Sequence, residues 1–125
     1  MYHSIYVPVD NSSHSDRAVA LGVEVGAACA ARLTGCHVYA ARMHDYRFKQ
    51  MEYTLPEEYL AEDELHRQRK IHDSLITMGL ELVSDCYLDP LAGLAEKAGL
   101  ELERKMIDGK HSTELLRDVR ESDYD

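Results

Sequence analysis

The sequence predicts an α/β domain in which helices cover the faces of an open parallel sheet. Short β-branched and aromatic runs alternate with longer segments of helical periodicity, and the order strand, helix, strand is complete within roughly the first forty residues. The length of 125 residues suits one domain, and a composition of 45% apolar and 30% charged residues is typical of globular proteins. We therefore expect a single domain over residues 1–125.

The first element is a short strand from Ser4 to Val9, which is rich in β-branched and aromatic residues and runs into a polar turn. Pro8 cannot donate a hydrogen bond to a neighbouring strand, so it belongs at the carboxyl end of this strand or on an edge of the sheet. A helix follows from Ser15, with Ser13 or Ser15 as its expected cap. Small and apolar residues recur along it at helical spacing, which predicts close packing on the sheet: Ala18, Leu21, Gly22, Val25, Cys29 and Leu33.

The second strand is expected from Cys36 to Ala41, after the Thr34-Gly35 turn, and it is apolar enough to be covered on both faces. The polar stretch from Arg42 to Pro56 shows no clear period and is interpreted as a long loop. A helix with one apolar stripe is expected from Glu57 to about Tyr87, and the Asp89-Pro90 pair is expected to end it.

Three short elements complete the predicted chain. Pro90 to Ala98 is expected to form a short helix that Gly99 stops. Leu100 to Ile107 alternates in polarity and predicts a third strand, more exposed than the first two. Ser112 or Thr113 can cap a last helix. The whole order favours an open parallel sheet with three strands.

Charge and composition exclude several classes of protein. The 23 acidic against 14 basic side chains give a formal net charge of −9, which disfavours binding to nucleic acid. No apolar run approaches the ~20 residues of a membrane helix, so we expect no membrane partner. The three cysteines form no CxxC pair, which suits reduced thiols and the cytoplasm.

The candidate site is the turn Val9-Asp10-Asn11-Ser12 at the carboxyl end of the first strand. In open α/β sheets ligands bind beyond this end of the strands, and the following helix amino terminus attracts anions. Asp10 could accept hydrogen bonds from a ribose hydroxyl or an adenine amino group. The same residue types dominate ordinary helix starts, so Asp10 and the serines could equally serve only as turn and cap.

No catalytic or metal-binding arrangement stands out. The seven histidines lack an HExxH or i, i+4 pair, and we expect them to be structural or solvated, with no metal bound. His72 lies on the apolar stripe, where a partly buried, hydrogen-bonded imidazole is expected. A nucleophile elbow, a Walker A sequence and GxGxxG are all absent, so the sequence does not predict an enzyme.

The chain resembles the universal stress protein family. The segments that carry the resemblance occur in the family's order along the whole chain: Ile5-Tyr6-Val7-Pro8-Val9-Asp10-Asn11-Ser12, Ser15-Asp16-Arg17-Ala18, Leu33-Thr34, His37-Val38, Ala98-Gly99-Leu100-Glu101, Asp108-Gly109 and Glu114-Leu115-Leu116. The resemblance implies a five-stranded parallel sheet in the order 3-2-1-4-5, related to that of adenine nucleotide α-hydrolases, and a homodimeric stress-response protein. It also implies ATP or AMP as ligand, with Asp10 contacting the nucleoside and Val38 meeting the adenine. Asn11 stands where the family often has glycine.

One departure from the family pattern shapes the functional expectation. The family's glycine-rich phosphate loop, G-x-x-G followed about nine residues later by G-S/T, is absent, which leaves a triphosphate without its cradle of backbone N–H groups. By resemblance the chain holds three of the usual five strands, and we expect nucleotide binding only in the complete domain.

The missing fourth strand also predicts self-association. It would leave the strand of residues 4–9 with an open edge, covered by a second copy or by another part of the chain. Two other functions stay open: an interaction module that binds no nucleotide, and an α-hydrolase enzyme, whose SGGxDS motif is missing.

Overall fold

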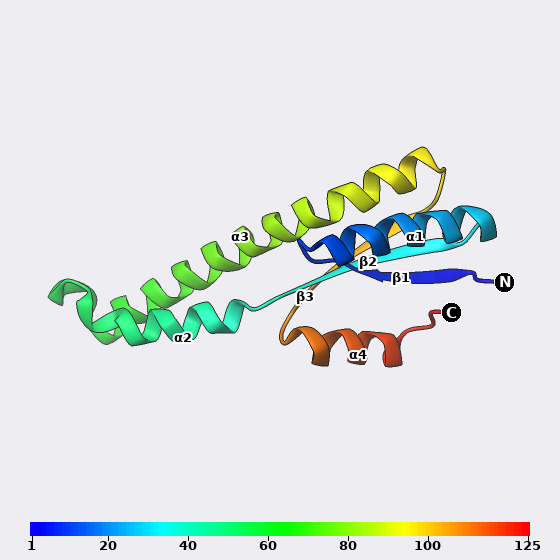
Figure 1. The fold of residues 1–125 in the computed structure, drawn as a ribbon. Coiled ribbons are helices and arrows are strands. Elements are labelled where there is room, and N and C mark those ends of the chain that lie inside the picture. The colour runs from blue at the N-terminus through cyan, green and yellow to red at the C-terminus, as the bar shows by residue number, and fades with distance from the viewer.

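The computed structural model describes residues 1–125 and contains one three-stranded parallel sheet in the order β1-β2-β3. The strands are β1 (Ser4–Pro8), β2 (Arg32–Tyr39) and β3 (Leu102–Asp108). Figure 1 shows helices on both faces of this sheet. The predicted fold class, with three parallel strands and flanking helices, is confirmed.

Helices α1 (Ser13–Cys29) and α3 (Glu62–Lys97) pack on one face of the sheet. The small residues of α1 allow this approach, because a Cβ added at Gly22 would lie 2.8 Å from Val7 Cγ2. Gly26 is similarly close to Leu33, whose Cδ2 would lie 3.0 Å from such an atom. The predicted close packing of a small-residue helix on the sheet is therefore confirmed.

Strand β2 is the centre of the molecule, and every residue in it except Arg32 is buried. Gly35 lies directly beneath α3, where Leu88 and Leu91 are both fully buried. The apolar core gathers around this contact and consists of Val7, Val9, Val19, Leu33, Leu88, Leu91 and Ala95.

The short helix α4 (His111–Glu121) covers the opposite face of the sheet. A polar cluster fastens it there, because Lys105 Nζ of β3 lies 2.9 Å from Asp118 Oδ1 and 3.0 Å from Tyr124 Oη. The Tyr124 ring stacks on Tyr6 of β1, with ring centroids 4.5 Å apart. The hydrogen bonds from Lys105 and Ser122 outweigh desolvation and hold the pKa of Asp118 below its usual value.

Helix α3 is continuous through Pro90, so the predicted break at Asp89-Pro90 is wrong. Proline removes one hydrogen bond to the carbonyl four residues earlier, here that of Cys86. Both Pro90 and Cys86 are exposed, which allows water to satisfy that carbonyl. The flanking Leu88 and Leu91 are buried in the core, and their packing holds the helix together across the proline. Gly99, at φ +68°, follows the end of the helix as expected.

The predicted loop from Arg42 to Pro56 is also wrong, because most of it forms helix α2 (Ala41–Met51). Two 3-10 turns, η1 (Glu52–Thr54) and η2 (Glu57–Tyr59), then lead into α3. In Figure 1, α2 and the first half of α3 form a two-helix arm that extends beyond the sheet. Only Ala41 of α2 is buried, so the helix leaves no regular apolar stripe in the sequence.

Other boundaries shift by a few residues. Helix α1 ends at Cys29, and Ala30 adopts a left-handed conformation with φ 51°, so Leu33 belongs to β2 instead of the helix. Strand β2 begins at Arg32 and ends at Tyr39, so the predicted turn at Thr34-Gly35 is wrong and the strand ends two residues earlier than predicted. The cap of α4 is Lys110, without a side-chain hydrogen bond, in place of the expected Ser112 or Thr113. None of the helices, including the 36 residues of α3, combines the length and apolarity needed to cross a membrane.

The open edge of β1 meets the C-terminal residue of the chain. Arg32 N–H bonds to His3 O and Val9 N–H to Cys36 O, which directs the backbone groups of Ser4, Tyr6 and Pro8 away from β2. Asp125 donates its N–H to Ser4 O at 2.9 Å and accepts the Ser4 N–H at 2.8 Å. Pro8 has no N–H, so Tyr6 is the strand residue that presents both backbone groups on this side.

Substitution of Gly35 tests the close packing of β2 and α3. A Cβ at this position would lie 2.6 Å from Leu91 Cδ2 and 2.9 Å from Leu88 Cδ2 in a closed core. We expect Gly35→Ala to lower the free energy of unfolding by roughly 1–3 kcal/mol in urea denaturation. Gly79→Ala is the control, because a Cβ at that position would have no side chain and no other element within 4 Å. This change should stabilise the helix by about 0.5–1 kcal/mol. Equal effects of the two substitutions would contradict this packing.

His37 of β2 is a buried neutral imidazole. Its Nδ1 lies 2.7 Å from Ser84 Oγ, and because the Ser84 hydroxyl donates to Leu80 O, Nδ1–H is the donor to Ser84. Desolvation lowers the pKa of His37 below its ordinary value of 6.5, with a smaller effect from His111 in the same direction.

This environment predicts a loss of stability as the pH falls below about 6.5. In that range the imidazole gains a proton in the unfolded chain before it does so in the folded chain, which favours unfolding. His37→Asn keeps a donor to Ser84 and removes this titration. Denaturation midpoints of the variant should therefore change less between pH 7 and pH 5 than those of the parent protein. Parallel pH profiles of the two proteins would contradict the assignment.

Candidate functional site

The turn after β1 is held by three interlocking hydrogen bonds. Asp10 Oδ1 accepts the Ser12 N–H at 2.9 Å, and Ser12 Oγ accepts the Ser15 N–H at 3.1 Å. The Ser15 hydroxyl oxygen in turn accepts the Asp10 N–H at 3.0 Å. Ser12 is therefore the N-cap of α1, in place of the expected Ser13 or Ser15. The turn and capping roles foreseen for Asp10 and the serines are thus real.

A cavity of about 310 Å³ lies beside this turn, at the carboxyl ends of β1 and β2. It brings together four of the five predicted site residues: Val9, Asp10, Ser12 and Val38. Asn11 is exposed and does not line the cavity. The volume is in the range of about 300–1,000 Å³ that is usual for small-molecule sites.

Asp10 remains available to a ligand although it shapes the turn. The hydrogen bond from Ser12 lowers the pKa of Asp10, and His111 and His37 act weakly in the same direction, so the carboxylate is anionic at neutral pH. Only Oδ1 accepts a hydrogen bond within the chain, which leaves Oδ2 as a free acceptor. The exposed side chain lines the cavity, so this oxygen could bind a hydroxyl or amino group.

Helix α4 contributes residues to the cavity that sequence analysis did not find. His111 and Leu115 close it from the side of the sheet opposite α1, and His14 borders it from α1. Since α4 reaches the cavity by packing under β2, no local pattern could have indicated its part. A candidate helix start directly after the third strand was the only available signal.

A second hollow adjoins the first at His111. It is bordered by basic groups of Arg42, Lys110 and Arg117, by the carboxylates of Asp108 and Glu114, and by the start of α4, whose first N–H groups receive no side-chain cap. Arg117 is paired with Glu114 at 3.1 Å, whereas Arg42 and Lys110 form no ion pair. The uncapped helix start and these two cations favour a negatively charged group.

His37, Ser84 and His72 lie outside the lining of this cavity. The His37–Ser84 pair has hydrogen-bonding geometry, but Ser84 lies on the buried face of α3, is completely buried and cannot meet a substrate. Instead of the expected hydrogen-bonded imidazole, His72 has a buried Nδ1 without a partner and lies on the arm beside Asp45 and Asp73.

Comparison with solved structures supports the fold. A universal stress protein family member from Burkholderia pseudomallei is 16% identical with a TM-score of 0.54, and the match covers 96% of this chain and 74% of that chain. UspA from Lactobacillus plantarum is 18% identical with a TM-score of 0.56, covering 96% of this chain and 71% of that chain. A universal stress protein in complex with cAMP is 19% identical with a TM-score of 0.51, covering 95% and 66% respectively.

The comparison of sequences gives the family directly. No curated protein matched the chain. The sequence model of the universal stress protein family, however, matches residues 1–125, the full length of the chain. This match agrees with the segments quoted above and with the parallel sheet that the structure shows. The chain therefore belongs to the universal stress protein family.

Proposed function

We propose that this chain is a nucleotide-responsive binding domain of the stress response, without catalytic machinery, that takes an adenine nucleotide at the ends of β1 and β2. The observation that carries the proposal is the cavity that brings Asp10 and Val38 together beside the start of α4. Ligands of open α/β sheets bind at this end of the strands. The free thiols of the chain suit a reducing compartment, so the proposal includes the cytoplasm.

Each part of the ligand has a matching group. Asp10 Oδ2 is a charged acceptor for the ribose hydroxyls, and the apolar wall formed by Val9, Val38 and Leu115 suits the flat face of a base. The adjoining hollow, with Arg42, Lys110 and the uncapped start of α4, suits a phosphate. The cAMP complex of a structurally similar protein fits a ligand of this class.

The groups of the chain that could bind phosphate favour a nucleoside monophosphate over a triphosphate. The glycine-rich loop of the family pattern is absent, and two exposed cations with one helix start replace it only in part. We therefore propose that AMP or a cyclic monophosphate binds at least as tightly as ATP, because the β- and γ-phosphates would lack backbone donors.

Calorimetric titration tests this proposal. AMP should bind the parent protein, and Asp10→Asn should weaken AMP and adenosine alike by about tenfold or more, because a charged acceptor is lost. Asparagine retains the oxygen that accepts the Ser12 N–H, so the turn should persist. Asp16→Asn is the matched control, since Asp16 lies in the first turn of α1 but outside the cavity. It should leave the affinity unchanged.

Lys110→Ala distinguishes the contribution of the phosphate to binding from that of the nucleoside. It should weaken AMP by up to about fivefold, as expected for an exposed ion pair, and leave adenosine unaffected. Lys97→Ala, at the far end of α3, is the control. Absence of AMP binding by the parent protein, or equal binding by the Asp10→Asn variant, would overturn the proposal.

A second function, self-association, is favoured by an apolar groove along the open edge of β1. The groove has a volume of about 610 Å³, and nine of its thirteen lining residues are hydrophobic, among them Leu21 and Val25 of α1 and Val119 of α4. It runs beside Tyr6, whose backbone groups face away from β2. We propose that a second copy of the chain packs on this groove and on the edge of residues 4–9, at the Tyr6 backbone groups that the Asp125 contact with Ser4 leaves free, and forms a homodimer.

Light scattering after gel filtration tests the dimer. Leu21→Lys places a charge in the groove and should shift the protein from dimer to monomer. Leu75→Lys is the matched control, because Leu75 is equally exposed (62% against 61%) but lies on the arm. Dissociation by the arm substitution instead, or a parent protein that stays monomeric at high concentration, would contradict an interface at β1.

A further inference from the structure

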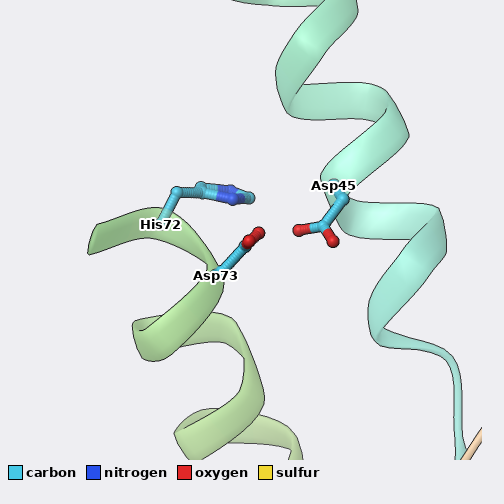
Figure 2. Close-up of side chains that lie close together, drawn as sticks. All are labelled: Asp45, His72 and Asp73. Atoms are coloured by element: carbon cyan, nitrogen blue, oxygen red, sulfur yellow. The ribbon is translucent and has the colours of Figure 1, made fainter. Parts of the chain in front are cut away.

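Three potential metal ligands converge where the two helices of the arm meet. Asp45 projects from α2 towards His72 and Asp73 of α3, and Figure 2 shows the imidazole and both carboxylates directed into one space. One donor atom from each residue lies within 4.8 Å of the other two. This cluster is remote from the nucleotide cavity, with which it shares no lining residue.

The ligand groups of this cluster lack partners within the chain. His72 Nδ1 is buried and makes no hydrogen bond, which is costly for a polar atom unless a ligand satisfies it. Neither Asp45 nor Asp73 forms a salt bridge, although several ion pairs exist elsewhere on the arm and sheet. The cluster therefore combines two closely spaced acidic groups with one unsatisfied imidazole.

The side chains around the cluster hold it in place. The Phe48 ring stacks on the His72 ring at 4.1 Å with an interplanar angle of 14°, which fixes the plane of the imidazole. One carboxylate oxygen of Asp45 lies within 4.8 Å of one carboxylate oxygen of Asp73. Two carboxylates this close repel each other when both are ionised, and a cation between them would remove the repulsion.

We propose that Asp45, His72 and Asp73 bind one divalent transition-metal ion, of which Zn²⁺ is the best match, and that the ion fastens α2 to α3. Imidazole nitrogen and carboxylate oxygen are both ligands that zinc accepts, and water can complete the fourth position. Zinc bonds of about 2.0–2.2 Å require the donors to move together by about 1 Å, which side-chain rotation can supply.

Basic residues near the cluster do not occupy it. Arg69 forms a bidentate ion pair with Glu52, with Nε 2.5 Å from Oε1 and Nη2 2.8 Å from Oε2. Lys49 and Lys70 border a hollow that Asp45 and Asp73 also line, but both lysines are exposed and form no ion pair with the cluster. Their charges are screened by water and salt, so they weaken the attraction for a cation without replacing it.

A metal here would have a structural effect, because α2 packs on α3 with almost no buried side chains. Helix α2 buries only Ala41, and the Phe48–His72 stack joins it to α3, while Glu52 of η1 forms an ion pair with Arg69. An ion shared between the helices binds only the closed arm and so stabilises it by mass action. The arm would then be ordered when metal is present and loosened when it is removed.

Titration of the tag-free, chelator-treated chain with ZnCl₂ tests the proposal. We expect one ion per chain, slower amide hydrogen exchange in α2 and the start of α3, and binding at least about tenfold weaker in Asp45→Asn and His72→Gln. Asparagine removes a charge from a repelling pair, so the Asp45→Asn variant should fold at least as well as the parent, which circular dichroism checks. Asp63→Asn is the matched control, because Asp63 lies on the same helix but outside the cluster and the hollow beside it.

Two results would overturn the metal site. Binding that persists in the folded Asp45→Asn and His72→Gln variants would place the zinc on other histidines. Failure of Zn²⁺ to bind the parent protein would equally exclude a metal ion that joins α2 to α3. Binding that leaves amide hydrogen exchange in α2 unchanged would exclude it too. Neither result affects the nucleotide proposal, whose variants lie in a different part of the fold.

Discussion

Burial of strand β2 is the constraint on which the rest of the structure depends. This strand pairs with a neighbour on each side and is covered by α1 and α3 on one face and by α4 on the other. The closest contact is at Gly35, where the absence of a side chain lets Leu88 and Leu91 of α3 reach the backbone. That packing fixes α3 so firmly that the helix continues through Pro90.

The position of the candidate site follows from the same packing. Parallel strands end at one edge of the sheet, so the turn after β1 and the last residues of β2 lie side by side. Helix α4 passes beneath β2 and brings His111 to that edge. The turn serves the fold and the site together, since Asp10 orders the start of α1 with one oxygen and keeps the other free.

Patterns local in the sequence were sufficient for the sheet and for most of the site. The β-branched run before Asp10 and the small-residue helix after it identify the strand, the turn and the crossover, which together place Val38 beside Asp10. Patterns that depend on distant partners were not predictable. Helix α2 packs on a single helix and shows no apolar stripe, and the continuity of α3 at Pro90 depends on the core around it. The grouping of Asp45 with His72 likewise requires the two helices to fold back on each other.

The central claim is that an adenine nucleotide occupies the cavity at the ends of β1 and β2. A titration of the isotope-labelled protein with AMP, followed through its backbone amide resonances, tests this most directly. The account predicts saturable shifts at Val9, Asp10, Ser12, Val38 and His111, which surround the cavity. Shifts confined to the groove along β1, at Tyr2, Leu21 and Val25, or no shifts at all, would contradict it.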